Sequence, residues 1–250
     1  MIQVLHRALN ILEFIAQHPN REYTLSEIAD HHQLNHGTCA NILKTLVTRR
    51  YIEQVGHKKG YRLGAMAYHL TRNKAYKRDL IAAADAPMQQ LTQAINETSL
   101  LTIVVNDRRI TLHSVECDRD IQARGNVDRT VYDSATGRLI LAYQPEAEQV
   151  RFARTYGLPT EEVWSGITSE TQLVQALTQL RESGLSIDHT SRQIVGLAVP
   201  IYQQGRVEAA LGVFLPELRY TDTHRDEIIN ALRQTAAQIN QNLQQLKIDS

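Results

Sequence analysis

A set of polar side chains at helical spacing lies between residues 36 and 48, and its members are of types that bind nucleic acids. Plotted at 100° per residue, one side of this segment carries Gly37, Thr38, Asn41, Lys44, Thr45 and Thr48. Threonine, asparagine and lysine form hydrogen bonds to base edges and phosphates. An ordinary solvated side would carry more glutamate and lysine. The pattern therefore predicts a helix that contacts DNA bases.

The opposite side of the same segment is apolar and predicts packing against a core. Cys39 lies at its centre, which favours a buried structural thiol over a redox sensor. Cys117 is the second of two cysteines in the chain, and two cysteines cannot form a disulfide framework. We expect both to remain thiols in a reducing compartment.

The elements that position this helix are predicted in the sequence before and after it. Residues 4–15 have an amphipathic helical pattern, and Thr24-Leu25-Ser26-Glu27 matches a capping box that begins a second helix. After residue 49, two β-prone runs at 51–55 and 61–63 flank a basic tip that contains Lys58 and Lys59. Three helices followed by a basic hairpin predict a winged helix-turn-helix.

Charge is distributed unevenly along the chain. The formal net charge is zero, but residues 1–62 contain eight lysines and arginines against five acids, so the remainder has a net charge of −3. Six of the ten histidines also lie in this first part. A basic end joined to an acidic body favours a polyanionic partner at that end alone.

The remaining sequence predicts an α+β domain built on two hairpins. Strands at 100–105 and 110–115 flank a turn at 106–109, and strands at 194–202 and 207–215 flank a turn at 203–206. Helices are expected at 78–95, where Pro87 would kink or divide the helix, and at 136–143, 145–156, 169–183 and 221–246. An antiparallel sheet with packed helices is the expected architecture.

These patterns predict three segments: a winged helix-turn-helix domain at 1–64, a linker helix at 65–78 and a second domain at 79–250. No apolar run approaches the ~18 residues that would span a bilayer, and residues 2–16 are too polar for a signal peptide. We therefore expect a cytoplasmic protein that does not bind membranes.

Five segments, in the same order as in the family, resemble IclR-type transcriptional regulators over essentially the whole length of the chain. They are VLHRALNILE at 4–13, TLSEIA at 24–29, YRLG at 61–64, SATGRLILA at 134–142, and AVPI at 198–201 with AALGV at 209–213. The resemblance implies a GAF-like second domain. It also implies a homodimer or homotetramer that binds a pseudo-palindromic double-stranded operator under control of a small organic acid.

The implied mechanism is a population shift. An acid that favours one arrangement of the second domains changes the spacing of two DNA-binding helices. Such regulators, repressors among them, control catabolic operons and are not enzymes. Whether this chain represses or activates depends on where its operator lies relative to the promoter.

The resemblance also directs attention to the start of the DNA-binding helix. The family usually has Pro-Lys-Ser-Thr where this chain has Asn35-His36-Gly37-Thr38, which indicates a different operator sequence. Asn35 can cap the helix. We expect Thr38, Asn41 and Thr45 to face bases. The rest of the expected DNA-binding set is Thr24, His36, Gly37, Lys44, Arg49, Lys58, Lys59 and Arg62.

For the effector, the resemblance points to backbone N–H groups at a helix N-terminus formed by Ser134, Ala135, Thr136 and Gly137, which would bind a carboxylate. Other polar family positions are changed here. Gly196 replaces a cysteine or serine, Gly212 and Phe214 replace serines, and Asp188 begins a shortened form of an Asp-x-Glu-Glu run. The changes make the pocket less polar or give it another shape. They favour a larger sugar acid or an aromatic acid over glyoxylate-like ligands.

Other interpretations remain open at this point. His113 and Cys117 would share one face of a strand, with Asp118 and Asp120 nearby, so a metal- or thiol-dependent enzyme is conceivable. No second ligand pair or nucleophile elbow accompanies them, and we expect no catalytic residue, metal or cofactor. Two further alternatives remain. The winged helix could contact protein and not DNA, or the polar side of residues 36–48 could simply face solvent.

Overall fold

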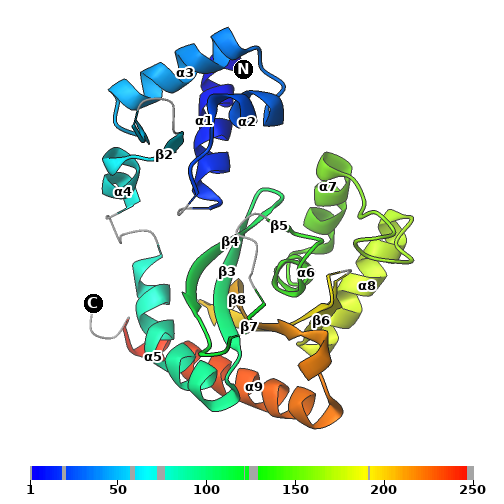
Figure 1. The fold of residues 1–250 in the computed structure, drawn as a ribbon. Coiled ribbons are helices and arrows are strands. Elements are labelled where there is room, and N and C mark those ends of the chain that lie inside the picture. Colours follow the sequence, from blue (N-terminus) through cyan, green and yellow to red (C-terminus); the bar gives the residue numbers. More distant parts are fainter. Residues whose placement is uncertain are drawn as a thin grey trace. The chain divides into compact units, whose positions relative to one another are not determined.

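The computed structural model describes residues 2–18, 21–56, 60–71, 77–120, 122–123, 129–190 and 192–246 (Figure 1). The chain divides into two compact units, residues 1–76 and residues 77–250. No helix among the described residues is long and apolar enough to cross a membrane.

The first unit is a winged helix followed by a short helix. Its elements are α1 (Gln3–Ala16), α2 (Leu25–His31), α3 (His36–Thr48), β1 (Ile52–Gln54), β2 (Tyr61–Leu63) and α4 (Ala65–Thr71). Strands β1 and β2 pair antiparallel, with Ile52 opposite Leu63. The predicted helices and hairpin are confirmed.

Local capping determines where α2 and α3 begin. The backbone N–H of Thr24 donates to Glu27 Oε2 at 2.7 Å, and the backbone N–H of Glu27 donates to Thr24 Oγ1 at 3.2 Å. This is the predicted capping box. Asn35 Oδ1 accepts a hydrogen bond from the Thr38 backbone N–H at 2.7 Å, which caps α3. The apolar sides of these helices form one core, in which Cys39 is fully buried as expected.

The second unit is built on one six-stranded sheet whose neighbouring strands all pair antiparallel. In sheet order its strands are β5 (Arg129–Thr130), β4 (Arg108–Val115), β3 (Thr98–Val105), β8 (Arg206–Pro216), β7 (Ile194–Gln203) and β6 (Ser186–His189). Both predicted hairpins are confirmed, and β5 and β6 extend the sheet beyond them.

Helices cover both faces of this sheet (Figure 1). The elements are α5 (Arg78–Ile95), α6 (Ala135–Ala142), α7 (Glu146–Tyr156), α8 (Glu170–Ser183), a short 3-10 turn (Glu217–Arg219) and α9 (Asp222–Gln245). Helices α5 and α9 pack on one face, whereas α6 packs on the other with α7 and α8 outside it. Helix α5 continues through Pro87, so the proline does not divide it. The predicted α+β class is confirmed.

The first hairpin differs from the prediction at its turn. Only Asn106 and Asp107 form the turn, with Asn106 at a φ of 57°, and β4 already begins at Arg108. A two-residue turn needs positive φ values, which asparagine adopts more readily than most residues. Arg108 and Arg109 are therefore strand residues. Because side chains alternate along a strand, Arg108 is exposed and Arg109 is buried.

Candidate functional sites

One side of α3 is exposed and polar. His36, Gly37, Asn41, Lys44 and Thr45 are exposed, and Thr38 is half-buried beside them. The Thr45 hydroxyl donates to the Asn41 carbonyl at 3.0 Å, so its remaining lone pairs can only accept. Within the described part of the chain, the Asn41 and Lys44 side chains form no hydrogen bond or ion pair. This surface can therefore offer donors, acceptors and a positive charge to a ligand.

The other residues expected to bind DNA have varied surroundings. The Thr24 hydroxyl is engaged in the capping box with Glu27. Arg49 ends α3 and is exposed, and Arg62 on β2 forms an exposed ion pair with Glu53 at 2.6 Å. Lys58 and Lys59 lie outside the described residues.

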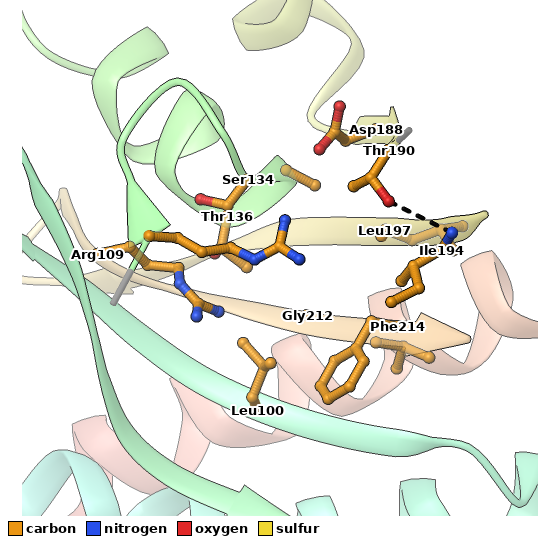
Figure 2. Close-up of a pocket in the computed structure, with 14 residues that line it drawn as sticks. Leu100, Arg109, Ser134, Thr136, Asp188, Thr190, Ile194, Leu197, Gly212 and Phe214 are labelled. Atoms are coloured by element: carbon orange, nitrogen blue, oxygen red, sulfur yellow. Dashed lines mark hydrogen bonds between the residues drawn. The ribbon is translucent and has the colours of Figure 1, made fainter. Parts of the chain in front are cut away.

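A cavity in the second unit lies between the N-terminus of α6 and the sheet (Figure 2). It holds about 450 Å³ of empty space, counting the part open to solvent. Seven of the eight residues expected at the effector site line it, namely Ser134, Ala135, Thr136, Asp188, Gly196, Gly212 and Phe214.

Gly137 does not line the cavity, but the turn that forms the cavity wall requires it. A Cβ at this position would lie 2.4 Å from the Val131 carbonyl oxygen and 2.7 Å from Ser134 Oγ. Ser134 Oγ accepts a hydrogen bond from the Gly137 backbone N–H at 3.1 Å and so caps α6. Glycine therefore permits the close turn that brings the start of α6 to the cavity.

The N-terminus of α6 offers polar groups to this cavity. The first N–H groups of a helix have no intrahelical acceptor and carry roughly half a positive charge. Thr136 is 4% exposed, and its Oγ1 has no hydrogen-bond partner among the described residues. A buried hydroxyl without a partner is costly, so a bound ligand that hydrogen-bonds to it would remove that cost.

A buried ion pair fixes Asp188 at the cavity wall. Arg138 Nη1 lies 2.9 Å from Asp188 Oδ1, and the two side chains are 7% and 6% exposed. Arg138 also donates to the Tyr132 and Val163 carbonyls and stacks over the Trp164 ring at 4.5 Å. Burial raises the pKa of Asp188, although the Arg138 charge opposes that rise. Asp188 is thus paired with Arg138 and does not contribute an isolated negative charge.

Two arginines that the sequence analysis did not assign to the site also line the cavity. Arg109 on β4 and Arg129 on β5 are direct cross-strand partners. Burial, followed by the positive charge of Arg129, lowers the pKa of Arg109 to about 10. Arg109 was expected in a turn and residues 129–130 in no element. The two-residue Asn-Asp turn was the signal that could have placed Arg109 inside the sheet.

The remaining wall is mainly apolar. It is formed by Leu100, Ile194, Leu197, Val213 and Phe214. A Cβ on Gly212 would lie 2.6 Å from Thr136 Cγ2, so this glycine permits close contact between α6 and β8. Gly196 is less restricted, because a Cβ there would lie 3.6 Å from the Ala135 Cβ.

The residues of the enzyme alternative have separate partners. His113 Nε2 lies 2.9 Å from Asp85 Oδ1 on α5. Cys117 is buried, and Thr98 Oγ1 donates to its sulfur at 3.5 Å. Among the described residues there is no cluster of three or more metal-binding side chains.

Comparison with known proteins places both units in one family. The family model described as "IclR helix-turn-helix domain" matches residues 4–56, and the model described as "Bacterial transcriptional regulator IclR C-terminal" matches residues 73–241. Together these matches cover most of the first unit and nearly all of the second unit.

Individual relatives agree with this assignment. The HTH-type transcriptional regulator KdgR of Escherichia coli K12 is 26% identical, over 93% of this chain and 89% of the relative. The transcriptional repressor IclR of the same organism is 25% identical, over 88% and 82%. A crystal structure of an IclR-type regulator from Alicyclobacillus acidocaldarius has a TM-score of 0.77 and 26% identity, covering 97% and 99% of the two chains. These relatives are regulators rather than enzymes, and the chain belongs to the IclR family of bacterial DNA-binding transcriptional regulators.

Proposed function

We propose that this protein binds a specific operator and that a small organic acid in the cavity of the second unit controls this binding. The observation that carries the proposal is the exposed, polar and mostly uncharged side of α3. Its side chains are suited to base edges, whereas a solvated helix face would be rich in glutamate and lysine. Bacterial operators lie in the cytoplasm, which is where we propose that the protein acts.

In this proposal the residues of the first unit have distinct tasks. Thr38, Asn41 and Thr45 contact bases, and Gly37 lets the start of α3 approach the DNA closely. Positive side chains bind phosphates and orient the domain. They are His36, Lys44, Arg49, Lys58, Lys59 and Arg62. Thr24 contributes by capping α2, which packs beneath α3.

For the effector, we propose that a carboxylate binds at the N-terminus of α6 beside Ser134 and Thr136. The apolar residues Leu100, Leu197 and Phe214 would contact the body of the molecule. The mainly apolar wall supports a larger acid over a two-carbon acid, and it suits an aromatic acid better than a sugar acid, whose hydroxyl groups would face apolar side chains.

In this proposal, the acid controls DNA binding through the way in which copies of the chain assemble. A homodimer or homotetramer presents two α3 helices to the half-sites of a pseudo-palindromic operator. An acid that binds one arrangement of the second units more tightly shifts the population toward it. The operon under control would be a catabolic one whose substrate or intermediate is that acid.

Mobility-shift titration with the protein's own upstream DNA and with a scrambled duplex tests the proposal. We expect preferential binding to the upstream duplex, weakening steeply between about 50 and 200 mM salt. Asn41→Ala should cost ~1–3 kcal/mol on the upstream duplex alone, whereas Lys44→Ala should weaken both duplexes and lower the salt slope by about 1. Glu13→Gln, on the exposed side of α1, is the control and should change neither. Equal affinity for the two duplexes would refute the proposal.

A further inference from the structure

Helix α1 is apolar on two sides, and the core of the first unit covers only one of them. Ile11 and Ile15 lie on the covered side and are buried in that core. On another side of the helix, Ile2, Leu5 and Leu9 are 67%, 52% and 52% exposed. Single exposed apolar side chains are ordinary on a protein surface, whereas a contiguous row of them marks an interaction surface.

The exposed row has the spacing of residues through which helices pair. Leu12 lies on the same side and is half-buried, so the row consists of Ile2, Leu5, Leu9 and Leu12. We call these four residues the α1 seam. Their intervals of three, four and three residues are those of the a and d positions of a heptad, which keep one side of a helix turned toward a partner helix. The seam is therefore suited to a second helix.

The seam is complementary to a reversed copy of itself. Its intervals read the same in both directions, so two α1 helices can pair antiparallel about a twofold axis. Ile2 of one copy then lies beside Leu12 of the other. Leu5 lies beside Leu9 in the same way, and the axis repeats both contacts. Every large apolar side chain of the seam thus has an apolar neighbour in the second copy.

Polar side chains at the edge of the seam favour the antiparallel direction. His6 and Glu13 lie one heptad apart along the same edge, and both are exposed. Helical side chains lean toward the N-terminus of their own helix, so His6 of one copy and Glu13 of an antiparallel copy lean toward each other. The imidazole N–H can donate to the carboxylate, and a glutamine at position 13 would keep an acceptor oxygen. In a parallel pair the two residues would lie ~10 Å apart along the axis.

The size of the seam indicates how strong this contact is. From Ile2 to Leu12 it is ~15 Å long, and a helix with its side chains is ~10 Å wide. Each partner in a standard interface buries ~800 Å², so the seam supplies only part of what a stable dimer needs. Two copies already held together elsewhere, or on one operator, have a high effective concentration of α1 and would pair through it.

Building on the homodimer proposed above, we propose that two copies of the first unit pair antiparallel through the α1 seam. Helices α1 and α3 pack in the same core, so pairing of α1 also fixes the two α3 helices relative to each other. Half-sites of an operator lie about one helical turn apart, and two α3 helices at a fixed spacing bind them together. The seam is in this way the part of the chain that sets the spacing.

Disulfide cross-linking of the full-length protein tests the pairing. Both native cysteines are buried, so a thiol introduced on the exposed side of α1 is the more accessible one. Co-expressed Leu5→Cys and Leu9→Cys chains should cross-link ~10-fold faster under mild oxidation than either variant alone, because positions 5 and 9 of two copies lie side by side. Gln3→Cys, which is exposed on another side of α1, is the control and should cross-link slowly.

Charged substitutions connect the pairing with operator binding. Leu5→Glu and Leu9→Lys each place a charge in the seam and should weaken binding to the upstream duplex ~10- to 100-fold, because the two first units no longer bind as one. Co-expression of the two variants should restore most of the affinity, since the new carboxylate and the new ammonium group then lie side by side. Leu218→Glu is the matched control, because Leu218 is a 78% exposed leucine of the second unit. It should bind as the unmodified protein does.

Three results would overturn the inference. Cross-linking of the co-expressed cysteine variants no faster than that of Gln3→Cys would show that another surface covers the seam. Faster cross-linking of Leu5→Cys or Leu9→Cys alone would show a parallel pair. Unchanged operator affinity in both charged variants would show that the pairing does not serve DNA binding. If the unmodified protein does not prefer its upstream duplex, the proposed function fails, and cross-linking still decides whether the seam pairs.

Discussion

Arg109 of β4 and Arg129 of β5 are direct cross-strand partners, and both line the cavity at the start of α6. Both side chains are largely buried, with Arg109 4% exposed and the Arg129 side chain 11% exposed. Burial, followed by the positive charge of Arg129, lowers the pKa of Arg109 to about 10.

The buried Arg138–Asp188 pair should contribute strongly to the stability of the second unit. Asp188→Ala leaves the Arg138 guanidinium buried without its carboxylate, which typically costs ~3–5 kcal/mol. Trp164 is the single tryptophan of the chain and lies against Arg138, so its fluorescence reports unfolding at this position. Glu170→Ala, which breaks an exposed pair with Arg154, is the comparison and should change little. Equal effects of the two substitutions would argue against a buried structural pair.

The capping box of α2 should make that helix sensitive to acid. Hydrogen bonds from the Thr24 backbone and hydroxyl, with help from Arg21, lower the pKa of Glu27. A carboxyl group with a lowered folded-state pKa stabilises the fold above its unfolded-state pKa, and this contribution is lost as the pH falls through the folded-state value. Hydrogen exchange at residues 25–31 should show greater protection in the unmodified protein than in Glu27→Gln at pH 7, and a smaller difference near pH 3. A difference that does not change with pH would contradict this.

Two glycines in helices should respond differently to alanine. At Gly37 a Cβ would meet its nearest neighbour, Asn35 Oδ1, at 3.6 Å, so Gly37→Ala should stabilise α3 by roughly 0.5–1 kcal/mol. At Gly137 a Cβ would lie 2.4 Å from the Val131 carbonyl oxygen, so Gly137→Ala should lower the melting temperature and weaken acid binding. Thermal unfolding of both variants compares them directly. A stabilised Gly137→Ala variant would show that the turn before α6 can move freely.

The sequence predicts those parts of the fold that depend on local signals. Thr24 and Asn35 cap helices through neighbouring backbone groups, and Gly184 ends α8 with a φ of 62° that glycine adopts without strain. Strands β5 and β6 carry weaker local signals. They have two and four residues and exist because they pair with β4 and β7. Edge strands of this length depend on tertiary contacts.

Among the residues that line the cavity, some could likewise be predicted from the sequence and others depend on strand pairing. Ser134, Asp188 and Gly212 were expected through the family resemblance, and the structure brings them to one cavity. Arg109 and Arg129 were missed because the pairing of β4 with β5 places them opposite each other at the cavity, and the sequence alone does not reveal that register. That register depends on a turn of two residues where four were expected.

The central claim, that an acid in the cavity controls operator binding, is tested most directly by fluorescence anisotropy. The full-length protein is titrated onto its upstream duplex with and without a saturating concentration of an organic acid that binds the protein. We predict a change in operator affinity of ~5- to 150-fold, the usual range of coupling between two sites, and a smaller change or none in Thr136→Val, which removes the hydroxyl beside the proposed carboxylate site. An operator affinity that is the same with and without the bound acid would contradict the account.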